Sequence, residues 1–320
     1  MHYTRSEAKK WANDTLKGFF LCPVTPVNND FNFDEEGMRA NVESFIEMGV
    51  DGLVVGGFIA ECWNATLDEW YRYHEVMAEA VNGRIPIFSI ILDPSAYQAV
   101  EKMQRLEAMG FDGVEVINPV VQLRTDDEIF DWFKFITDRS DMAVMLYRTP
   151  VSGKVLGWDL MNRLADLETV VGTKQGVVSR AESLKLRHIM RDDFVLSDPL
   201  EPVFLDDLRH GGQVVFGELS FILYGKKRHL VTEYRALAAQ GKWEEAYQVS
   251  EQLAGVRDFY GDVFLWDVVH TFTYASALAS MKVWFEEIGL KAGPIRPPVA
   301  QASDELRQRI KSTLKELGVT

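Results

Sequence analysis

The segment Glu168-Thr-Val-Val-Gly-Thr-Lys-Gln-Gly-Val177 places a lysine, Lys174, in a stretch that otherwise has the composition of a fully buried strand. Val170 and Val171 are β-branched and apolar, and Gly172 follows them, a pattern that suits the interior of a parallel sheet. A lysine at the end of such a strand is desolvated, so its pKa is expected to fall and its neutral amine to attack carbonyl carbons. The alternative is that Lys174 lies past the strand and its ammonium reaches solvent.

Strand-like and helix-like segments alternate on both sides of this lysine. We expect strands at 18–24, 51–56, 85–91, 113–117, 142–147, around Lys174, at 194–197 and at 213–216. Helices separate them at 34–48, from Thr66, at 95–109, from about Asp126, and at 158–167, 180–190 and 201–208. Eight such units with right-handed crossovers predict an α/β fold, a (β/α)8 TIM barrel. An open doubly wound sheet is the alternative, but no Gly-x-Gly-x-x-Gly motif follows the first strand.

The chain is expected to have three parts. Residues 1–17 hold an N-terminal helix, residues 18–221 hold the barrel strands and helices, and residues 222–320 hold the last barrel helix and a C-terminal helical extension. In this extension we expect helices at 222–240, 243–260, 268–288 and 304–317. The segment Ala292-Gly-Pro-Ile-Arg-Pro-Pro298 interrupts the helical pattern before the last of them.

Composition limits the partners of the protein. The 320 residues are 47% hydrophobic and 26% charged, which supports a large core, and the net charge of −14 disfavours nucleic acids and anionic membranes as partners. Cys22 and Cys62 form no disulfide framework. The start lacks the apolar run of a signal peptide and no apolar stretch could span a membrane, so we expect a cytoplasmic protein. The histidines show no ligand spacing, so we expect no metal and no cofactor.

The chemistry of a closed barrel lies at the carboxyl ends of its strands. Lys174 ends the sixth expected strand, and Tyr147 ends the fifth. Because adjacent strands lie about 4.8 Å apart, the amine and the phenol can reach one substrate atom. We therefore predict that Lys174 and Tyr147 are catalytic, with Tyr147 as a general acid and base.

Several motifs together resemble the dihydrodipicolinate synthase / N-acetylneuraminate lyase superfamily of class I aldolases. They are Thr25-Pro26, a loop ending in Glu61, the Tyr-x-x-Pro of Tyr147 to Pro150, the Gly-x-Lys of Lys174, and the Ala-Gly-Pro-x-Arg-Pro-Pro before Val299. The resemblance, from about Gly18 to Pro298, implies that Lys174 forms an imine with a 2-oxo acid, usually pyruvate. It also implies that Tyr147 relays protons and that the protein is a homotetramer.

The chain departs from that family at the substrate. Where members carry Gly-Thr-Thr-Gly-Glu, this chain has Gly57-Phe58-Ile59-Ala60-Glu61, so the hydroxyls that hold the pyruvyl carboxylate are absent. Pro119-Val120-Val121 replaces the tyrosine that the synthases send into a neighbouring subunit, and Val151-Ser152-Gly153 replaces their carboxylate-binding arginine. An apolar mouth is expected, and its predicted residues are Phe58, Ile59, Trp63, Val120 and Phe216. The alternative is that these residues pack against the helical extension or a subunit partner.

These features favour a lyase of the hydratase-aldolase kind, which joins or cleaves pyruvate and an apolar or aromatic aldehyde; Glu61-Cys62 resembles that branch. The alternatives are a 2-oxo-acid dehydratase, a dihydrodipicolinate-synthase-like synthase, and a non-catalytic barrel that only binds a ligand. Arg148 could replace the lost hydroxyls, and Glu61 or Glu218 could act as a base. The candidate substrate-binding residues are Thr25, Phe58, Ile59, Ala60, Glu61, Arg148 and Phe216.

Overall fold

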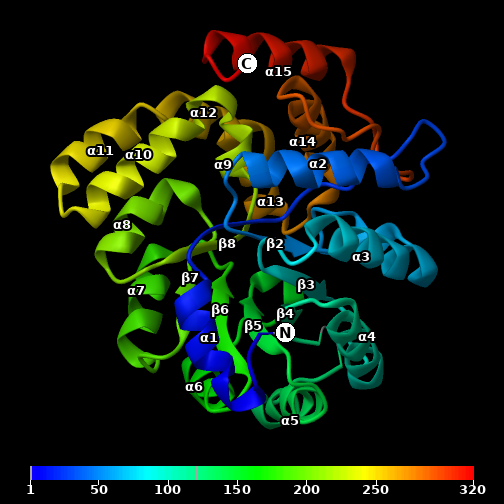
Figure 1. Ribbon diagram of the computed structural model, residues 1–320, viewed down its shortest axis with the longest axis vertical. Helices are drawn as coiled ribbons and strands as arrows, with labels where there is room; N and C mark the ends of the chain where they lie inside the picture. The colour runs from blue at the N-terminus through cyan, green and yellow to red at the C-terminus, as the bar shows by residue number, and fades with distance from the viewer. Residues whose placement is uncertain (1, 120–121) are drawn as a thin grey trace.

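The computed structural model describes residues 2–119 and 122–320, and it folds as a (β/α)8 barrel (Figure 1). Eight parallel strands follow the order β7-β6-β5-β4-β3-β2-β1-β8. No ladder joins β7 to β8 among the described residues, but the Phe216 N–H donates to Ser197 Oγ across this gap at 2.9 Å. The barrel is therefore nearly closed, as the alternation of segments predicts. Val120, expected at its mouth, lies outside the described residues.

The strands and helices alternate along the chain. The strands are β1 (Gly18–Leu21), β2 (Gly52–Val55), β3 (Ile87–Ile91), β4 (Gly113–Ile117), β5 (Ala143–Arg148), β6 (Val170–Gln175), β7 (Val195–Ser197) and β8 (Val214–Glu218). The helices up to β8 are α1 (Ala8–Thr15), α2 (Glu35–Glu47), α3 (Leu67–Val81), α4 (Ala96–Met109), α5 (Asp126–Thr137), α6 (Trp158–Ala165), α7 (Arg180–Ile189) and α8 (Phe204–Arg209). Short 3-10 turns are η1 (Arg5–Glu7), η2 (Cys62–Asn64), η3 (Pro150–Ser152), η4 (Glu201–Val203) and η5 (Gly225–Lys227).

Local sequence explains several of these boundaries. Strand β1 stops at Leu21 instead of continuing to residue 24, because Pro23 has no N–H for a ladder bond. Helix α3 begins where its capping box predicts: Thr66 Oγ1 accepts from the Glu69 N–H and Glu69 Oε2 accepts from the Thr66 N–H, both at 3.2 Å. Helix α5 uses the same device with Thr125 and Glu128.

Aromatic side chains fill the barrel interior. The Phe216 ring stacks on Phe20 at 5.4 Å and meets Phe88 edge-on at 5.2 Å, and all three are fully buried. The expectation that Phe216 lies at the mouth is therefore wrong, because its side chain points into the packed interior between β1 and β3. Such aromatic pairs stabilise the barrel beyond their buried area.

The C-terminal region is helical, but its helices are shorter than expected. Its elements are α9 (Ser220–Leu223), α10 (Arg228–Ala239), α11 (Trp243–Glu251), α12 (Ala254–Tyr260), the π-helical turn η6 (Gly261–Leu265), α13 (Trp266–Thr271), α14 (Ala275–Glu287) and α15 (Asp304–Glu316). The helix expected at 268–288 is interrupted because Phe272 adopts a left-handed conformation, with φ of 55°, and ends α13. In Figure 1, α10 and α11 run side by side and α15 ends the chain above α14. None of the described helices is long and apolar enough to cross a membrane.

Candidate active site

Lys174 lies near the carboxyl end of β6, and its side chain stays inside the barrel. It is aligned with Tyr147 of β5 and Ser197 of β7, and only 6% of the residue is exposed. Its Nζ donates a hydrogen bond to the Gly217 carbonyl oxygen of β8 at 3.0 Å. The expected position at the end of a buried strand is confirmed, and the alternative in which the ammonium reaches solvent is wrong.

Gly217 makes room for this amine. Its φ of +70° lies in the left-handed region, and a Cβ at this position would lie 2.7 Å from the Lys174 Nζ and 3.2 Å from the Glu115 Oε2. A side chain at position 217 would therefore strain the backbone and displace the amine.

Glu115 of β4 faces Lys174 across the barrel interior. Its Oε1 lies 3.5 Å from the Lys174 Nζ, and the carboxylate is fully buried. Burial is the largest single influence on the pKa of Lys174 and lowers it, but the Glu115 carboxylate, together with Tyr274 and Cys22, outweighs burial and raises that pKa above its ordinary value. The predicted fall of the pKa is therefore wrong, because a buried amine paired with a buried carboxylate keeps its proton.

Sequence reasoning missed Glu115, although a signal for it exists. The strand Gly-Val-Glu-Val-Ile, residues 113–117, holds an acid in an apolar run, just as the β6 segment holds a lysine. An acid and a base, each within an apolar strand of the same barrel, indicate a buried ion pair between Glu115 and Lys174.

A second phenol lies next to Tyr147. The Tyr147 and Tyr274 hydroxyl oxygens are 2.9 Å apart, and the Tyr147 ring centroid lies 4.6 Å from the Lys174 Nζ. The Tyr274 ring stacks almost parallel on Phe58, with ring centroids 5.2 Å apart. Burial raises the pKa of Tyr147 and of Tyr274, so both phenols are protonated at neutral pH. Sequence reasoning missed Tyr274, because 127 positions separate it from Tyr147 and no local pattern indicates the contact.

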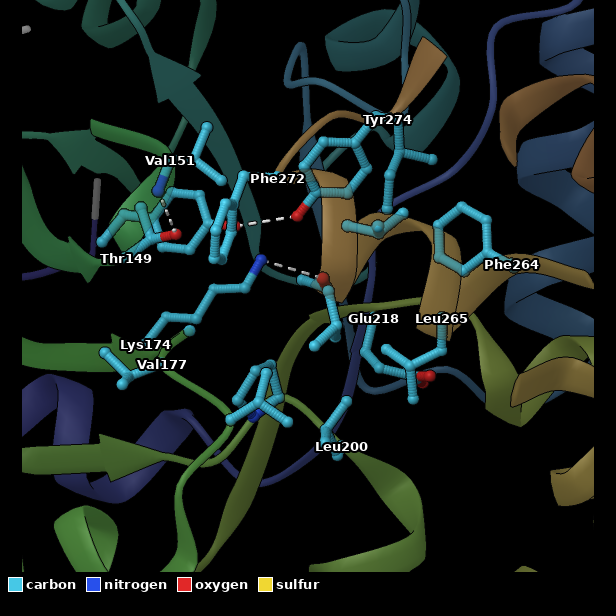
Figure 2. Close-up of a pocket in the computed structure, with 18 of the residues that line it drawn as sticks. Thr149, Val151, Lys174, Val177, Leu200, Glu218, Phe264, Leu265, Phe272 and Tyr274 are labelled. Atoms are coloured by element: carbon cyan, nitrogen blue, oxygen red, sulfur yellow. Dashed lines mark hydrogen bonds between the residues drawn. The ribbon is translucent and has the colours of Figure 1, made fainter. Parts of the chain in front are cut away.

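Lys174 and Tyr147 open onto a cavity at the carboxyl ends of the strands (Figure 2). Its empty volume is about 700 Å³, including the solvent at its mouth. The C-terminal elements α12, η6 and α13 supply one wall, which consists of Tyr260, Phe264, Leu265, Val268, Val269 and Phe272. The strand ends supply the other apolar residues, which include Ile59, Pro150, Val151, Val177, Pro199 and Leu200. A cavity of this lining suits an apolar group.

The π-helical turn η6 shapes the apolar wall. A Cβ at Gly261 would lie 2.6 Å from the Trp266 indole nitrogen, so a larger residue at the start of this turn would have to displace the Trp266 ring. The extra residue in the turn brings Phe264 and Leu265 to the cavity, where Figure 2 shows them across from Lys174. Turns of this kind are frequent at functional sites.

Polar groups in this cavity are few. The polar side chains are those of Tyr147, Thr149, Lys174, Glu218, Tyr260 and Tyr274, and Lys174 is the one cation among the described residues that line the cavity. Glu218 ends β8, and its carboxylate accepts from the Ser220 N–H at 2.7 Å. Burial raises the pKa of Glu218 to about 7, although this hydrogen bond opposes the rise.

Ile59 lines the cavity, and Phe58 lies beside it through its stacking on Tyr274. The backbone N–H groups of Ile59 and Ala60 donate no hydrogen bond to any described residue. The N–H groups of Gly57 and Phe58 are likewise not bonded to a described residue, so the donors that this loop can offer to a carboxylate are backbone N–H groups. Ile59 lines the cavity, whereas Ala60 lines the neighbouring pocket with Thr25 and Glu61.

Arg148 does not line the cavity. Its guanidinium donates to the Leu156 carbonyl at 2.7 Å and to Glu182 at 2.6 Å, and its residue is 3% exposed. It also lies 4.6 Å above the Trp158 ring. These contacts anchor β5 to α6 and α7, so the guanidinium is not available to a substrate carboxylate.

Glu61 and Thr25 belong to a neighbouring buried cluster instead of the cavity. Glu61 Oε1 lies 2.6 Å from the Lys282 Nζ, and its Oε2 accepts from the Arg296 N–H at 3.0 Å. Thr25 Oγ1 donates to the Ala60 carbonyl at 2.5 Å. These bonds tie the loop after β2 to α14 and to the segment before α15. Trp63 is 41% exposed and donates to the Phe58 carbonyl.

Comparisons with known proteins agree with this geometry. The sequence model described as the Dihydrodipicolinate synthetase family matches residues 15–317. A 4-hydroxy-tetrahydrodipicolinate synthase of Methanosphaera stadtmanae is 26% identical over 310 residues, which is 94% of this chain and 98% of that protein. One of Methanosarcina acetivorans is 27% identical over 308 residues, 95% and 99% of the two chains.

Solved structures share the fold. A dihydrodipicolinate synthase of Thermotoga maritima superposes with a TM-score of 0.81 at 22% identity, covering 96% of this chain and all of that one. The Escherichia coli protein YagE, described as a member of the dihydrodipicolinic acid synthase family in complex with pyruvate, gives a TM-score of 0.80 at 20% identity, with 95% and 99% covered.

Proposed function

Because this chain belongs to the dihydrodipicolinate synthetase family, whose members are Schiff-base lyases and synthases acting with pyruvate, we propose that its imine forms on Lys174. The observation that carries this proposal is a buried amine, 6% exposed, at the floor of an apolar cavity and beside a hydrogen-bonded phenol pair. We further propose that the reaction makes or breaks the bond between pyruvate and an apolar or aromatic aldehyde.

Imine formation begins with loss of a proton from Lys174 and attack of its Nζ on C2 of the 2-oxo acid. The former carbonyl oxygen takes up protons and leaves as water, and the nitrogen keeps one hydrogen and a positive charge. The Tyr147 hydroxyl, next to the amine, passes these protons, and Tyr274 extends the path by one hydroxyl. A pair of protonated phenols can donate at one end while accepting at the other.

Cleavage uses the iminium as an electron sink. In a 4-hydroxy-2-oxo acid bound in this way, the C4 hydroxyl loses its proton and the bond between C3 and C4 breaks. The aldehyde leaves, and the electron pair forms an enamine that is protonated at C3. Water then releases pyruvate from Lys174. For an arylidene-pyruvate, addition of one water across its double bond supplies this hydroxyl before cleavage.

The lining of the cavity supports an apolar aldehyde. One wall includes Phe264, Leu265, Val268 and Phe272, which suit an aromatic ring. The pyruvyl carboxylate would accept from backbone N–H groups of residues 57–60, of which Ile59 lines the cavity, since this loop has lost its hydroxyls.

A synthase reaction is the second candidate, because the relatives named above are 4-hydroxy-tetrahydrodipicolinate synthases. A dicarboxylic product needs a second group that binds an anion. Among the described residues of the cavity the one cation is Lys174, which the imine uses, and Arg148 is engaged elsewhere. These observations favour the apolar aldehyde over a carboxylated one.

The assay uses a panel of arylidene-pyruvates, with pyruvate release followed by lactate dehydrogenase and NADH. We expect turnover of aryl substrates, and we expect a carboxylated aldehyde to condense with pyruvate at least tenfold less efficiently. Lys174→Ala is the control that must abolish turnover. If the protein condensed pyruvate with the carboxylated aldehyde but turned over none of the aryl substrates, the synthase reaction would be favoured. A homotetramer remains our expectation, but both relay phenols come from one chain, so a dissociated subunit should keep them.

A further inference from the structure

Glu115 is a buried carboxylate inside the sheet. It is aligned with Ile90 of β3 and Met145 of β5, it is fully buried, and neither of its oxygens accepts a hydrogen bond from a described residue. An ionised carboxylate in such a place is strongly disfavoured unless a cation compensates it.

The compensating cation is the nucleophile itself. The Lys174 Nζ lies 3.5 Å from the Glu115 Oε1; the Glu115 side chain is fully buried, and the Lys174 side chain is 8% exposed and lines the cavity. The other groups that face this amine are Tyr147 of β5, Tyr274 before α14, Cys22 after β1 and the carbonyl of Gly217. Burial raises the pKa of the Cys22 thiol to about 12, so the thiol stays neutral. Burial also raises the pKa of the Glu115 carboxyl, but the Lys174 ammonium 3.5 Å away opposes that rise, which makes Glu115 the acid that can balance the charge of the amine.

We propose that Glu115 is the counterion of the Lys174 imine: its carboxylate holds the proton on the amine in the free enzyme and stabilises the positively charged iminium after condensation. The proposal rests on the imine assigned to Lys174 above. An ammonium and a ketone give a protonated imine and one water, with no net proton released. The charge opposite Glu115 is therefore the same before and after condensation, and one fixed carboxylate serves both states without rearrangement.

Burial alone acts against both charged states. It favours the neutral amine and the neutral imine, and only the protonated imine accepts the electron pair of the breaking bond well. A carboxylate beside the nitrogen reverses this preference. It thus extends to higher pH the range in which the reactive iminium is populated.

The test is Glu115→Gln, which keeps the size of the side chain and removes its charge. Competitive acetylation with acetic anhydride across pH 5–11, read from the mass of the Lys174 peptide, gives the pKa of the amine without any substrate. We expect the pKa of Lys174 to fall by about 1 to 3 pH units, the shift that a charge at this distance produces. Glu115→Asp should restore part of it.

A second readout follows the iminium. Cyanoborohydride reduces the protonated imine, so the pH at which trapping with pyruvate falls to half should also decrease in Glu115→Gln. Asp112→Asn is the matched control: it removes a buried carboxylate that lies just before β4 and bonds to the Ile87 N–H at 3.0 Å. This variant should leave unchanged both the pKa of Lys174 from acetylation and the pH at which reductive trapping with pyruvate falls to half. Thermal unfolding of each variant verifies that it is folded.

The outcomes separate the two proposals. Unchanged midpoints in a folded Glu115→Gln protein that still traps pyruvate on Lys174 would overturn the counterion while leaving the imine intact. No trapping in the unmodified protein with any 2-oxo acid would overturn the imine and the counterion together. Shifted midpoints in both readouts, with the Asp112→Asn protein unshifted, would establish the counterion.

Discussion

Replacing Tyr274 by phenylalanine removes one hydroxyl from the site and keeps the ring. The ring still stacks on Phe58 at 5.2 Å, so what is lost is the 2.9 Å contact with the Tyr147 hydroxyl. One hydrogen bond contributes about 1 kcal/mol to stability, which corresponds to a fall of about 2 °C in Tm for a domain of this size. The protein should therefore remain folded.

The effect on the reaction should be much larger than the effect on stability. A positioned proton donor or acceptor accelerates proton transfer by about 10²–10⁴-fold, which is about 3–5 kcal/mol of activation free energy. Because the two phenols form one path, Tyr147→Phe and Tyr274→Phe should each cost a similar amount. The double variant should cost about the same as one alone, since groups that act as a unit are not additive.

The assay needs pyruvate alone. The enamine exchanges the C3 hydrogens of pyruvate with solvent, so NMR in deuterium oxide measures their replacement by deuterium and requires no aldehyde. A Tyr274→Phe protein that exchanges pyruvate within threefold of the unmodified protein, while Tyr147→Phe is slowed a hundredfold, would show that Tyr274 is no part of the relay.

Three further predictions test the site and the fold. Ile59→Thr should lower the Kd for pyruvate about tenfold or more, because a hydrogen bond from a hydroxyl to a carboxylate contributes about 1.5–3 kcal/mol. Isothermal titration calorimetry measures this Kd, and an unchanged value would contradict the assigned position of the carboxylate. Gly217→Ala should abolish imine trapping, because its Cβ would lie 2.7 Å from the Lys174 Nζ, whereas Gly157→Ala, with no atom within 4 Å of its Cβ, should keep it. His74 is held neutral: burial lowers its pKa to about 3, and it bonds to Ser89 Oγ at 2.7 Å. In the unfolded chain the His74 imidazole takes up a proton below about pH 6.5, whereas in the folded protein it stays neutral down to about pH 3. The free energy of unfolding should therefore be highest above pH 6.5 and fall by about 1.4 kcal/mol per pH unit on acidification towards pH 3. Urea unfolding at pH 7 and pH 5 should show a smaller loss in His74→Gln; an equal loss would exclude His74 as its source.

The barrel is predictable because its signals are local. Each strand is a short apolar run, each helix has its own caps, as Thr66 and Glu69 show, and the alternation of the two allows few topologies. The juxtaposition of Lys174 and Tyr147 follows from that topology, since consecutive parallel strands are neighbours and their ends lie at one face.

The electrostatics of the site are not local in this sense. The direction of the pKa shift of Lys174 depends on Glu115, two strands away, and burial alone gives the opposite sign. Tyr274 enters from the C-terminal helices, where a left-handed Phe272 ends α13 and turns the chain towards the barrel. A side chain such as Arg148 can sit beside a catalytic position and still face the outer helices, because neighbours along a strand point to opposite sides.

Trapping of the imine tests the central claim most directly. The protein is incubated with pyruvate, and separately with aryl-substituted 2-oxo acids, reduced with borohydride, and weighed intact and as peptides. We predict one adduct per chain on the peptide that contains Lys174, and no adduct in Lys174→Ala. The mass of the adduct with pyruvate would show that pyruvate binds although the loop at 57–61 has no threonine hydroxyls. A folded protein that yields no adduct with any of these compounds, or an adduct on another lysine, would contradict the assignment of Lys174 as the nucleophile.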